Sequence, residues 1–230
     1  MNPKHQEKFD QVIERMTAAC RACGRNPGDV RLLAVSKTHP AEAVRTLYAL
    51  GQRAFGESYV DEAVQKIDAL GDLELEWHYI GPIQSNKTRQ ISARFDWVQS
   101  VDRLKIVRRL ADQRPADRPP LNVLIQVNID DEPQKAGCRS DEVDPLAAEI
   151  AARDNLRLRG LMAIPAPREG ASAQQQVFDR LFALYRHLQS GHTGVDTLSA
   201  GMTADLEAAI AAGSTMVRVG TALFGARTTV

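Results

Sequence analysis

The stretch Arg31-Leu32-Leu33-Ala34-Val35-Ser36-Lys37-Thr38-His39 gives the strongest indication of the fold. Its apolar run near the start of the chain is typical of a short strand buried in a parallel sheet. The turn that follows contains no glycine, whereas an open, doubly wound nucleotide-binding sheet carries a glycine-rich fingerprint at this point. The stretch therefore favours a barrel over the open sheet, which is the main alternative.

Short apolar runs like this one alternate with amphipathic segments along the rest of the sequence. Eight strands interleaved with seven helices, after one additional N-terminal helix, predict an α/β fold: a (β/α)8 TIM barrel in a single domain, 1–230. The strands are expected at 32–37, 53–56, 77–81, 96–100, 122–128, 159–164, 197–201 and 216–220. The helices are expected at 4–23 and near 41–50, 57–70, 84–93, 102–113, 141–153, 172–189 and 203–212.

The composition excludes several classes of protein. Lys+Arg and Asp+Glu both number 29, so the chain lacks the basic excess of a general nucleic-acid binder. It contains no run of about 20 apolar residues that could span a bilayer, and its polar N-terminus indicates no signal peptide. Three cysteines fit a reducing compartment, and we expect a cytoplasmic protein. Cys20 and Cys23 have helical spacing and are interpreted as ordinary helix residues.

Lys37 is the first candidate for chemistry, because ligands of such barrels bind where the strands end. Leu33, Val35 and Lys37 share one strand face, so Lys37 is able to point into the mouth of the barrel. A lysine that extends from the strand end to solvent fits the pattern equally well. If it lies inside, its amine is a candidate for a Schiff base with an aldehyde cofactor.

The ends of strands 7 and 8 carry residues suited to a phosphate group. Barrels of this type often bind phosphate with the loops at these two positions and the start of a short additional helix. Ser199 offers a hydroxyl and Gly201 permits close approach of the main chain. Gly220-Thr221 precedes a segment long enough for one helical turn. Either glycine alone would be read as the end of a strand, but the two together predict a phosphate site.

Arg218 and His78 are the remaining polar residues expected within the barrel. Arg218 lies on the opposite strand face from its valine neighbours and therefore points inward. A buried guanidinium needs an acceptor, which is either a carboxylate such as Glu57 or a ring nitrogen or anionic group of a ligand. His78 is expected to be a hydrogen-bonded residue of the barrel. No histidine or acidic cluster has the spacing of a metal site, and no metal is expected.

Taken together, these residues resemble the pyridoxal phosphate homeostasis proteins, which are single-domain barrels similar to the N-terminal domain of alanine racemase and bind pyridoxal 5'-phosphate (PLP). The resemblance covers nearly the whole chain, and as a set its motifs are highly specific. The matching segments are 33–37 (LAVSK), 55–62 (FGESYVDE), 77–87 (WHYIGPIQSNK), 160–165 (GLMAIP), 198–205 (LSAGMTAD) and 217–225 (VRVGTALFG).

The resemblance implies a role for each candidate cofactor-binding residue. It makes Lys37 the lysine that holds PLP covalently as a Schiff base, and Arg218 the partner of the pyridine nitrogen. It assigns the phosphate to Ser199, Gly220 and Thr221, with main-chain contacts near Gly201 and Met202. We also count His78 among the candidate cofactor-binding residues. One residue departs from the family: Ser58 stands where asparagine is usual, and we expect its shorter side chain to reach the cofactor only through water.

The resemblance also implies a role in vitamin B6 homeostasis without a defined catalytic reaction. Alanine racemase adds a C-terminal domain that supplies a second acid/base, and because this sequence ends at Val230 we expect no such domain. Two alternatives stay open: a small fold-type III PLP enzyme (an amino-acid racemase or lyase) using His78 or Tyr79 as its base, and a Schiff-base aldolase without cofactor. Expected partners are PLP and apo PLP-dependent enzymes, with no nucleic acid or membrane, and we expect a monomer.

Overall fold

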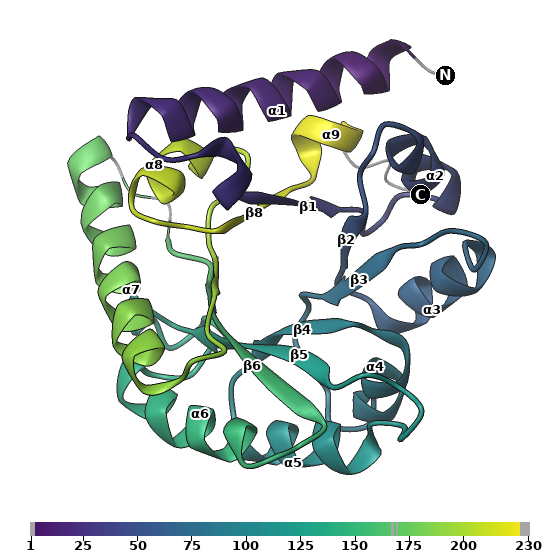
Figure 1. The fold of residues 1–230 in the computed structure, drawn as a ribbon, viewed down its shortest axis with the longest axis vertical. Coiled ribbons are helices and arrows are strands. Elements are labelled where there is room, and N and C mark those ends of the chain that lie inside the picture. Colours follow the sequence, from purple (N-terminus) through teal and green to yellow (C-terminus); the bar gives the residue numbers. More distant parts are fainter. Residues whose placement is uncertain (1–2, 167, 169, 226–230) are drawn as a thin grey trace.

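The computed structural model describes residues 3–166, 168 and 170–225, so the two ends of the predicted domain, 1–2 and 226–230, lie outside the described residues. Within the described chain, parallel strands β1 to β8 close into a barrel in sequence order, and β1 pairs with β8 (Figure 1). This confirms the predicted TIM barrel. The strands are β1 (Arg31–Val35), β2 (Ala54–Glu57), β3 (Glu76–Tyr79), β4 (Trp97–Val101), β5 (Leu121–Val127), β6 (Leu156–Ala163), β7 (Thr197–Ser199) and β8 (Met216–Val219).

Helices follow the strands and cover the outside of the barrel. The predicted N-terminal helix is present as α1, and none of the described helices is long and apolar enough to cross a bilayer. The helices are α1 (Pro3–Ala22), α2 (Ala41–Ala49), α3 (Val60–Ala69), α4 (Thr88–Arg94), α5 (Leu104–Gln113), α6 (Val143–Ala151), α7 (Ala171–Gly191), α8 (Leu206–Ala211) and α9 (Thr221–Phe224), with short 3-10 helices η1 (Pro27–Asp29) and η2 (Ser140–Glu142).

The predicted boundaries differ from the observed ones by a few residues. The helix expected from 57 begins at Val60, because Glu57 remains in β2 and pairs with Tyr79 of β3. The sixth strand begins at Leu156, where a leucine alternates with arginine before the predicted start. Such shifts are ordinary for boundaries that depend on tertiary hydrogen bonds.

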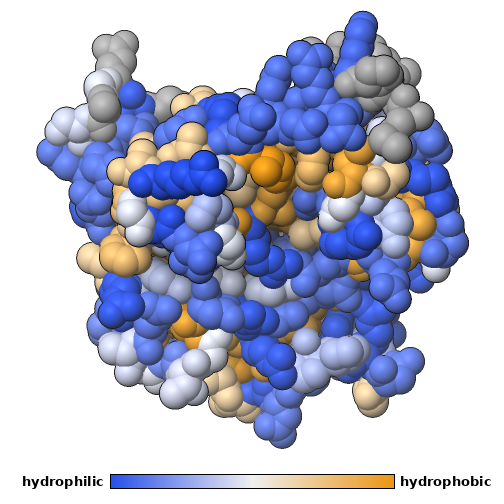
Figure 2. All heavy atoms as spheres, turned by 45° about the horizontal axis from the view of Figure 1, so that its top comes forward, coloured by the Kyte–Doolittle hydropathy of each residue, from blue (hydrophilic) through white to orange (hydrophobic). Residues whose placement is uncertain are grey.

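Side chains inside the barrel form two small apolar clusters. One contains Leu33, Ala54 and Met216, with Ile80 packed against it, and the other contains Trp97, Leu124 and Met162. A much larger apolar core fills the space between the strands and the surrounding helices. Hydrophilic side chains cover most of the face seen in Figure 2, and hydrophobic ones lie mainly in recesses between them. The polar groups inside the barrel, described below, thus lie next to apolar side chains.

Helix α1 packs on the outside of the barrel against α8 and α9 (Figure 1). Arg15 of α1 forms an ion pair with Glu207 of α8 and donates a hydrogen bond to the carbonyl oxygen of Thr203 at 2.9 Å. The additional N-terminal helix thus holds the loop that follows β7, which contributes to the site.

Candidate functional site at the mouth of the barrel

A cavity of about 310 Å³ lies where the strands end, and its volume is at the lower limit of small-molecule sites. Its lining comes from segments far apart in sequence that the barrel brings together. The lining residues are Val35, Lys37 and His39 after β1, Ile80 after β3, Ile164 after β6, Met202, Thr203 and Ala204 after β7, and Arg218, Gly220, Thr221 and Gly225 from β8 and α9.

Lys37 is half-buried in this lining, and the residues on both sides of it are held firmly. The preceding Ser36 donates its hydroxyl to Glu57 Oε1 at 2.6 Å. The following Thr38 has a φ of 66° and donates its main-chain N–H to Glu62 Oε1, also at 2.6 Å. A non-glycine residue with positive φ is uncommon and persists where its surroundings fix it. The direction in which Lys37 leaves the strand is therefore set by its neighbours.

A second lysine, Lys66 of α3, connects these contacts. It is 5% exposed, and its Nζ donates to the carbonyl oxygen of Ser36 at 2.7 Å, to Glu57 at 2.8 Å and to Glu62 at 2.6 Å. Burial raises the pKa of Glu57, and the charge of Lys66 opposes that rise. We refer to Lys66, Glu57 and Glu62 as the Lys66 cluster. The cluster lies outside the barrel strands, between β2 and α3, and it anchors the main chain on both sides of Lys37.

Arg218 projects into the barrel, as predicted, and is 4% exposed. Its Nη1 donates to the main-chain oxygen and the Oγ of Ser199, both at 2.8 Å, and its Nη2 donates to the main-chain oxygen of Ala163 at 2.9 Å. Burial lowers the pKa of Arg218 to about 10, so the guanidinium stays charged at neutral pH. A guanidinium has five N–H groups, and since these contacts use three, Arg218 has donors left for the cavity that it lines.

The sequence left open whether Glu57 accepts from Arg218, and this alternative is wrong. Phe55 and Glu57 lie on the outer face of β2, while Ala54 of the same strand belongs to the cluster inside the barrel. Glu57 therefore points away from Arg218 and pairs with Lys66. The acceptors of Arg218 are instead uncharged oxygens of β6 and β7.

The part of the lining that follows β8 is suited to an anion. Gly220 and Thr221 stand at the start of α9, where the first N–H groups of a helix have no acceptor within the helix. A Cβ on Gly220 would lie 3.2 Å from the carbonyl oxygen of Val35, so the glycine allows β1 and β8 to approach closely here. Thr203, which the sequence analysis did not select, adds a half-buried hydroxyl residue to the same lining.

Gly201 and Met202 shape the loop that carries Thr203. Gly201 has a φ of 95°, and a Cβ there would lie 2.6 Å from the Cβ of Ala209, so only glycine fits. The side chain of Met202 lines the cavity, but its main-chain N–H already donates to Asp205 Oδ1 at 2.6 Å. In this structure the main-chain contribution expected at Met202 is thus bonded within the loop.

Comparison with known proteins gives relatives that cover nearly the whole chain. Residues 9–228 match the family described as the alanine racemase N-terminal domain. The chain is 55% identical over 221 residues to the pyridoxal phosphate homeostasis protein of Pseudomonas aeruginosa, with 96% of this chain and 95% of that protein covered. The protein of the same name from Escherichia coli K12 is 54% identical over 220 residues, with 94% of each covered. This chain belongs to the pyridoxal phosphate homeostasis protein family.

A solved structure with similar architecture is that of PipY from Synechococcus elongatus with PLP bound. The TM-score is 0.79 at 35% sequence identity, and the comparison covers 93% of this chain and all of the PipY chain. The barrel described above is therefore the fold of the family.

Besides Gly201, three of the candidate cofactor-binding residues lie outside the cavity lining. Ser199 is fully buried, and its hydroxyl is bonded to Gln99 and Arg218. His78 is fully buried between Glu76 and Gln99, with its ring stacked on Trp97. In this structure both side chains have hydrogen-bond partners within the barrel, and their contact with a cofactor stays a prediction.

Ser58 is the third of these residues. It is half-buried, and its main-chain oxygen accepts a hydrogen bond from the hydroxyl of Tyr79 at 3.3 Å. A Cβ on Gly81 would lie 2.2 Å from the same oxygen, so the two loops touch here. In this structure the Ser58 segment supports the rim, and no lining atom of the cavity comes from it.

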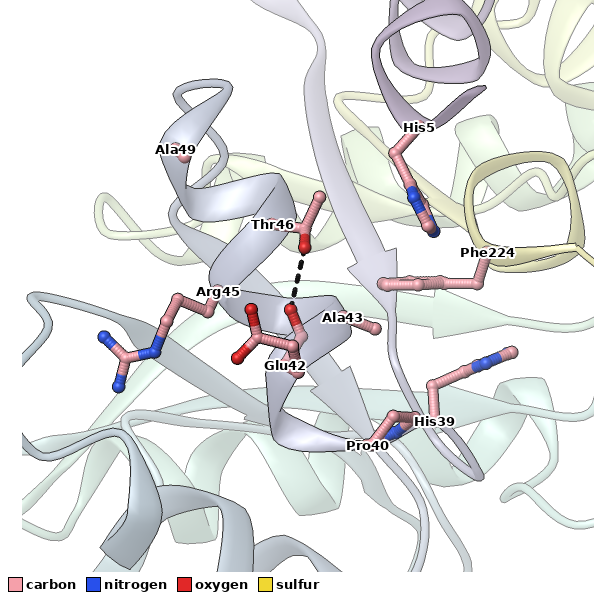
Figure 3. A pocket seen from close by; sticks show the side chains of 9 residues that line it. All are labelled: His5, His39, Pro40, Glu42, Ala43, Arg45, Thr46, Ala49 and Phe224. Atoms are coloured by element: carbon pink, nitrogen blue, oxygen red, sulfur yellow. Dashed lines mark hydrogen bonds between the residues drawn. The ribbon is translucent and has the colours of Figure 1, made fainter. Parts of the chain in front are cut away.

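A larger cavity, of about 750 Å³, lies between α1, α2 and α9 (Figure 3). His39 lines both cavities, and its ring stacks on Phe224 at a centroid distance of 4.8 Å. In the larger cavity Thr46 donates its hydroxyl to the carbonyl oxygen of Glu42, and Arg45 is paired with Asp72. Its described lining contains no lysine, so the smaller cavity is the better candidate for an aldehyde ligand.

Proposed function

We propose that this chain binds PLP in the mouth cavity, holds it as a Schiff base on Lys37, and takes part in PLP homeostasis without a catalytic reaction of its own. The observation that carries the proposal is the shared cavity of Lys37, Arg218, Thr203 and Thr221. The names of the relatives and the PLP-bound structure of PipY support it.

The residues present fit the three functional parts of PLP. The amine of Lys37 would hold the aldehyde carbon as a Schiff base, with the carbonyl oxygen released as water. The charged guanidinium of Arg218 donates a hydrogen bond toward the ring nitrogen. Thr203, Thr221 and the first N–H groups of α9 suit the phosphate. Bound in this way, PLP would supply an electrophilic carbonyl equivalent and an electron sink.

The proposed lack of catalysis rests on two features of the site. An arginine that keeps its proton leaves the ring nitrogen unprotonated, and a neutral ring is a weaker electron sink. The two candidate bases are occupied elsewhere: His78 lies below the cavity, and the Tyr79 hydroxyl donates to the Pro82 carbonyl oxygen at 3.0 Å. Burial also raises the pKa of Tyr79 to about 12. Absence of α-proton exchange of amino acids in deuterated water, above that with free PLP, would support this part.

The proposal extends to the setting in which the chain acts. We propose a single-domain, cytoplasmic monomer whose partners are PLP and apo PLP-dependent enzymes. Sedimentation of the purified protein tests the first part, and transfer of PLP to an apo-transaminase, measured by recovered activity, tests the second. A stable dimer, or recovery no faster than with free PLP, would contradict the corresponding statement.

The direct test of the proposed function is the absorption spectrum of the purified protein. We expect a visible band from bound PLP that disappears on treatment with borohydride, which reduces the C=N bond to a stable amine. Digestion and mass spectrometry should then find the pyridoxyl group on the peptide containing Lys37. A colourless protein that does not become coloured with added PLP would overturn the proposal.

The assignment of the phosphate to Thr203 gives a second prediction. Replacing Thr203 with alanine removes a hydroxyl from the lining, and loss of one hydrogen bond to a charged group is worth about 1.5–3 kcal/mol. We therefore expect the dissociation constant for PLP to rise about tenfold or more, while that for pyridoxal, which lacks the phosphate, stays unchanged. Thr46→Ala, in the larger cavity, is the matched control. Equal weakening of both ligands by Thr203→Ala would contradict the assignment.

A further inference from the structure

A chain of hydrogen bonds runs through the barrel from Arg218 to the opposite end. Arg218 Nη1 donates to Ser199 Oγ at 2.8 Å, and Ser199 Oγ donates to Gln99 Oε1 at 2.7 Å. Gln99 Nε2 lies 2.8 Å from His78 Nδ1, and His78 Nε2 lies 2.7 Å from Glu76 Oε1. The three middle residues are fully buried. Their polar groups therefore depend on other protein groups, here on one another, for their hydrogen bonds.

Glu76 is the charged end of this chain. It begins β3, on the side of the barrel away from the mouth, and also accepts from Arg31 Nη2 at 2.6 Å. Burial alone would raise the pKa of Glu76, but the hydrogen bond from His78 and the charge and hydrogen bond of Arg31 outweigh it and hold the pKa below its ordinary value. The side chain is thus a carboxylate at any physiological pH and can only accept hydrogen bonds.

The carboxylate determines which nitrogen of His78 carries the proton. Complete burial lowers the pKa of His78, so the ring is neutral and has one N–H. Because Nε2 faces Glu76, the proton belongs on Nε2, and Nδ1 is left as an acceptor. Gln99 must then direct its amide N–H₂ toward His78 and its oxygen toward Ser199.

The direction of the hydrogen bonds made by Ser199 follows in the same way. Since Gln99 presents an oxygen to Ser199, the single hydroxyl proton of Ser199 is used there, and its lone pairs face Arg218. All four hydrogen bonds consequently point in one direction, from a cation to an anion, and chains of this kind strengthen one another. Among the described residues, no carboxylate forms an ion pair with Arg218 directly, so Glu76 is the anion at the end of its hydrogen bonds.

We propose that Glu76, His78, Gln99 and Ser199 are positioning residues that orient the guanidinium of Arg218 toward the ring nitrogen of bound PLP. The inference rests on the proposed function and deepens it: the electronic state of the ligand depends on a carboxylate at the far end of the barrel. Neither Glu76 nor Gln99 lines the cavity, so they act only through Arg218.

Glu76→Gln is the decisive variant, because it removes the charge while keeping the size of the side chain. We expect the dissociation constant for PLP to rise about 5- to 30-fold, which corresponds to about 1–2 kcal/mol, and the visible absorption maximum of the bound ligand to move. Asp196→Asn is the matched control. Asp196 lies just before β7 and pairs with Arg159, and it is not part of the series of hydrogen bonds that ends at Glu76. The control should leave both quantities as in the original protein.

A double-variant cycle distinguishes the hydrogen-bond chain from a charge acting through space. Ser199→Ala interrupts the chain, and in that background Glu76→Gln should have no further effect on affinity or spectrum. Gln99→Met provides a second interruption if Ser199→Ala does not fold. Additive effects of Glu76→Gln in both backgrounds, or no effect of Glu76→Gln alone, would overturn the inference.

A measurement without PLP separates this inference from the proposed function. ¹⁵N NMR of the histidine side chains, with His78 assigned by its loss in His78→Gln, should show a neutral ring protonated on Nε2. If the original protein fails to bind PLP, the proposed function is wrong. The NMR result still decides whether the hydrogen bonds from Arg218 to Glu76 all point in the direction described. An imidazolium, or a proton on Nδ1, would contradict it.

Discussion

Replacing Lys37 with alanine is expected to abolish covalent retention of PLP while leaving the barrel folded. The side chain lines the cavity and is only half-buried, so its removal creates little unfilled core. Without the amine no C=N bond forms, and the remaining contacts hold the ligand reversibly. After incubation with PLP and treatment with borohydride, the intact mass should show no pyridoxyl addition, whereas the original protein should gain one.

Two controls make this result specific. Lys87→Ala removes a lysine that pairs with Asp61 on the surface, and it should retain full labelling. The circular dichroism spectrum of Lys37→Ala should match that of the original protein. Full pyridoxyl addition at another lysine of the Lys37→Ala variant would show that the site has been assigned wrongly.

Replacing Lys66 with methionine is expected to cause the largest loss of stability. Methionine fills most of the volume but leaves the carboxyl of Glu57, which is fully buried, without its counter-charge. Removing one partner of a buried ion pair typically costs about 3–5 kcal/mol. The midpoint of urea unfolding should fall accordingly. Lys87→Met, which breaks an exposed pair, should lower the free energy of unfolding by less than about 1 kcal/mol.

The pH dependence of this loss has a definite sign. Burial raises the pKa of Glu57 in the folded state above its ordinary value, and loss of Lys66 raises it further. The folded protein then binds more protons than the unfolded chain, so stability falls as pH rises. The deficit of Lys66→Met should therefore be smaller near pH 5 than near pH 8. A deficit that grows on acidification would show that Glu57 is not the group left unpaired.

Much of the fold was predictable, because a parallel barrel imposes a simple pattern. Each strand is a short apolar run, and the helices between the runs have regular amphipathic spacing. Lys37 and Arg218 could be selected because a charged residue on the inward face of an apolar strand needs a reason to be there. The glycines after β7 and β8 marked the loops that surround the cavity.

The remaining parts of the site depend on geometry that the sequence does not specify. Ser199 was expected at the phosphate, and this stays a prediction: in this structure its hydroxyl is bonded to Gln99 and Arg218 at the end of β7, and the loop that follows adds Thr203 to the cavity lining. The Lys66 cluster was missed, although Lys66 follows Glu62 by four residues and shares a helix face with Val60 and Ala63. A lysine on the apolar face of a helix was the available signal.

The pairing of β1 with β8 gives the cavity a further property. Lys37 follows the first strand and Arg218 lies in the last. A ligand bonded to both would therefore link β1 to β8, the pair of strands that closes the barrel. Such a ligand cannot be captured before the final strand has taken its place beside the first. Its uptake should then report completed folding, and amide hydrogens of β1 and β8 should exchange more slowly once the ligand is bound.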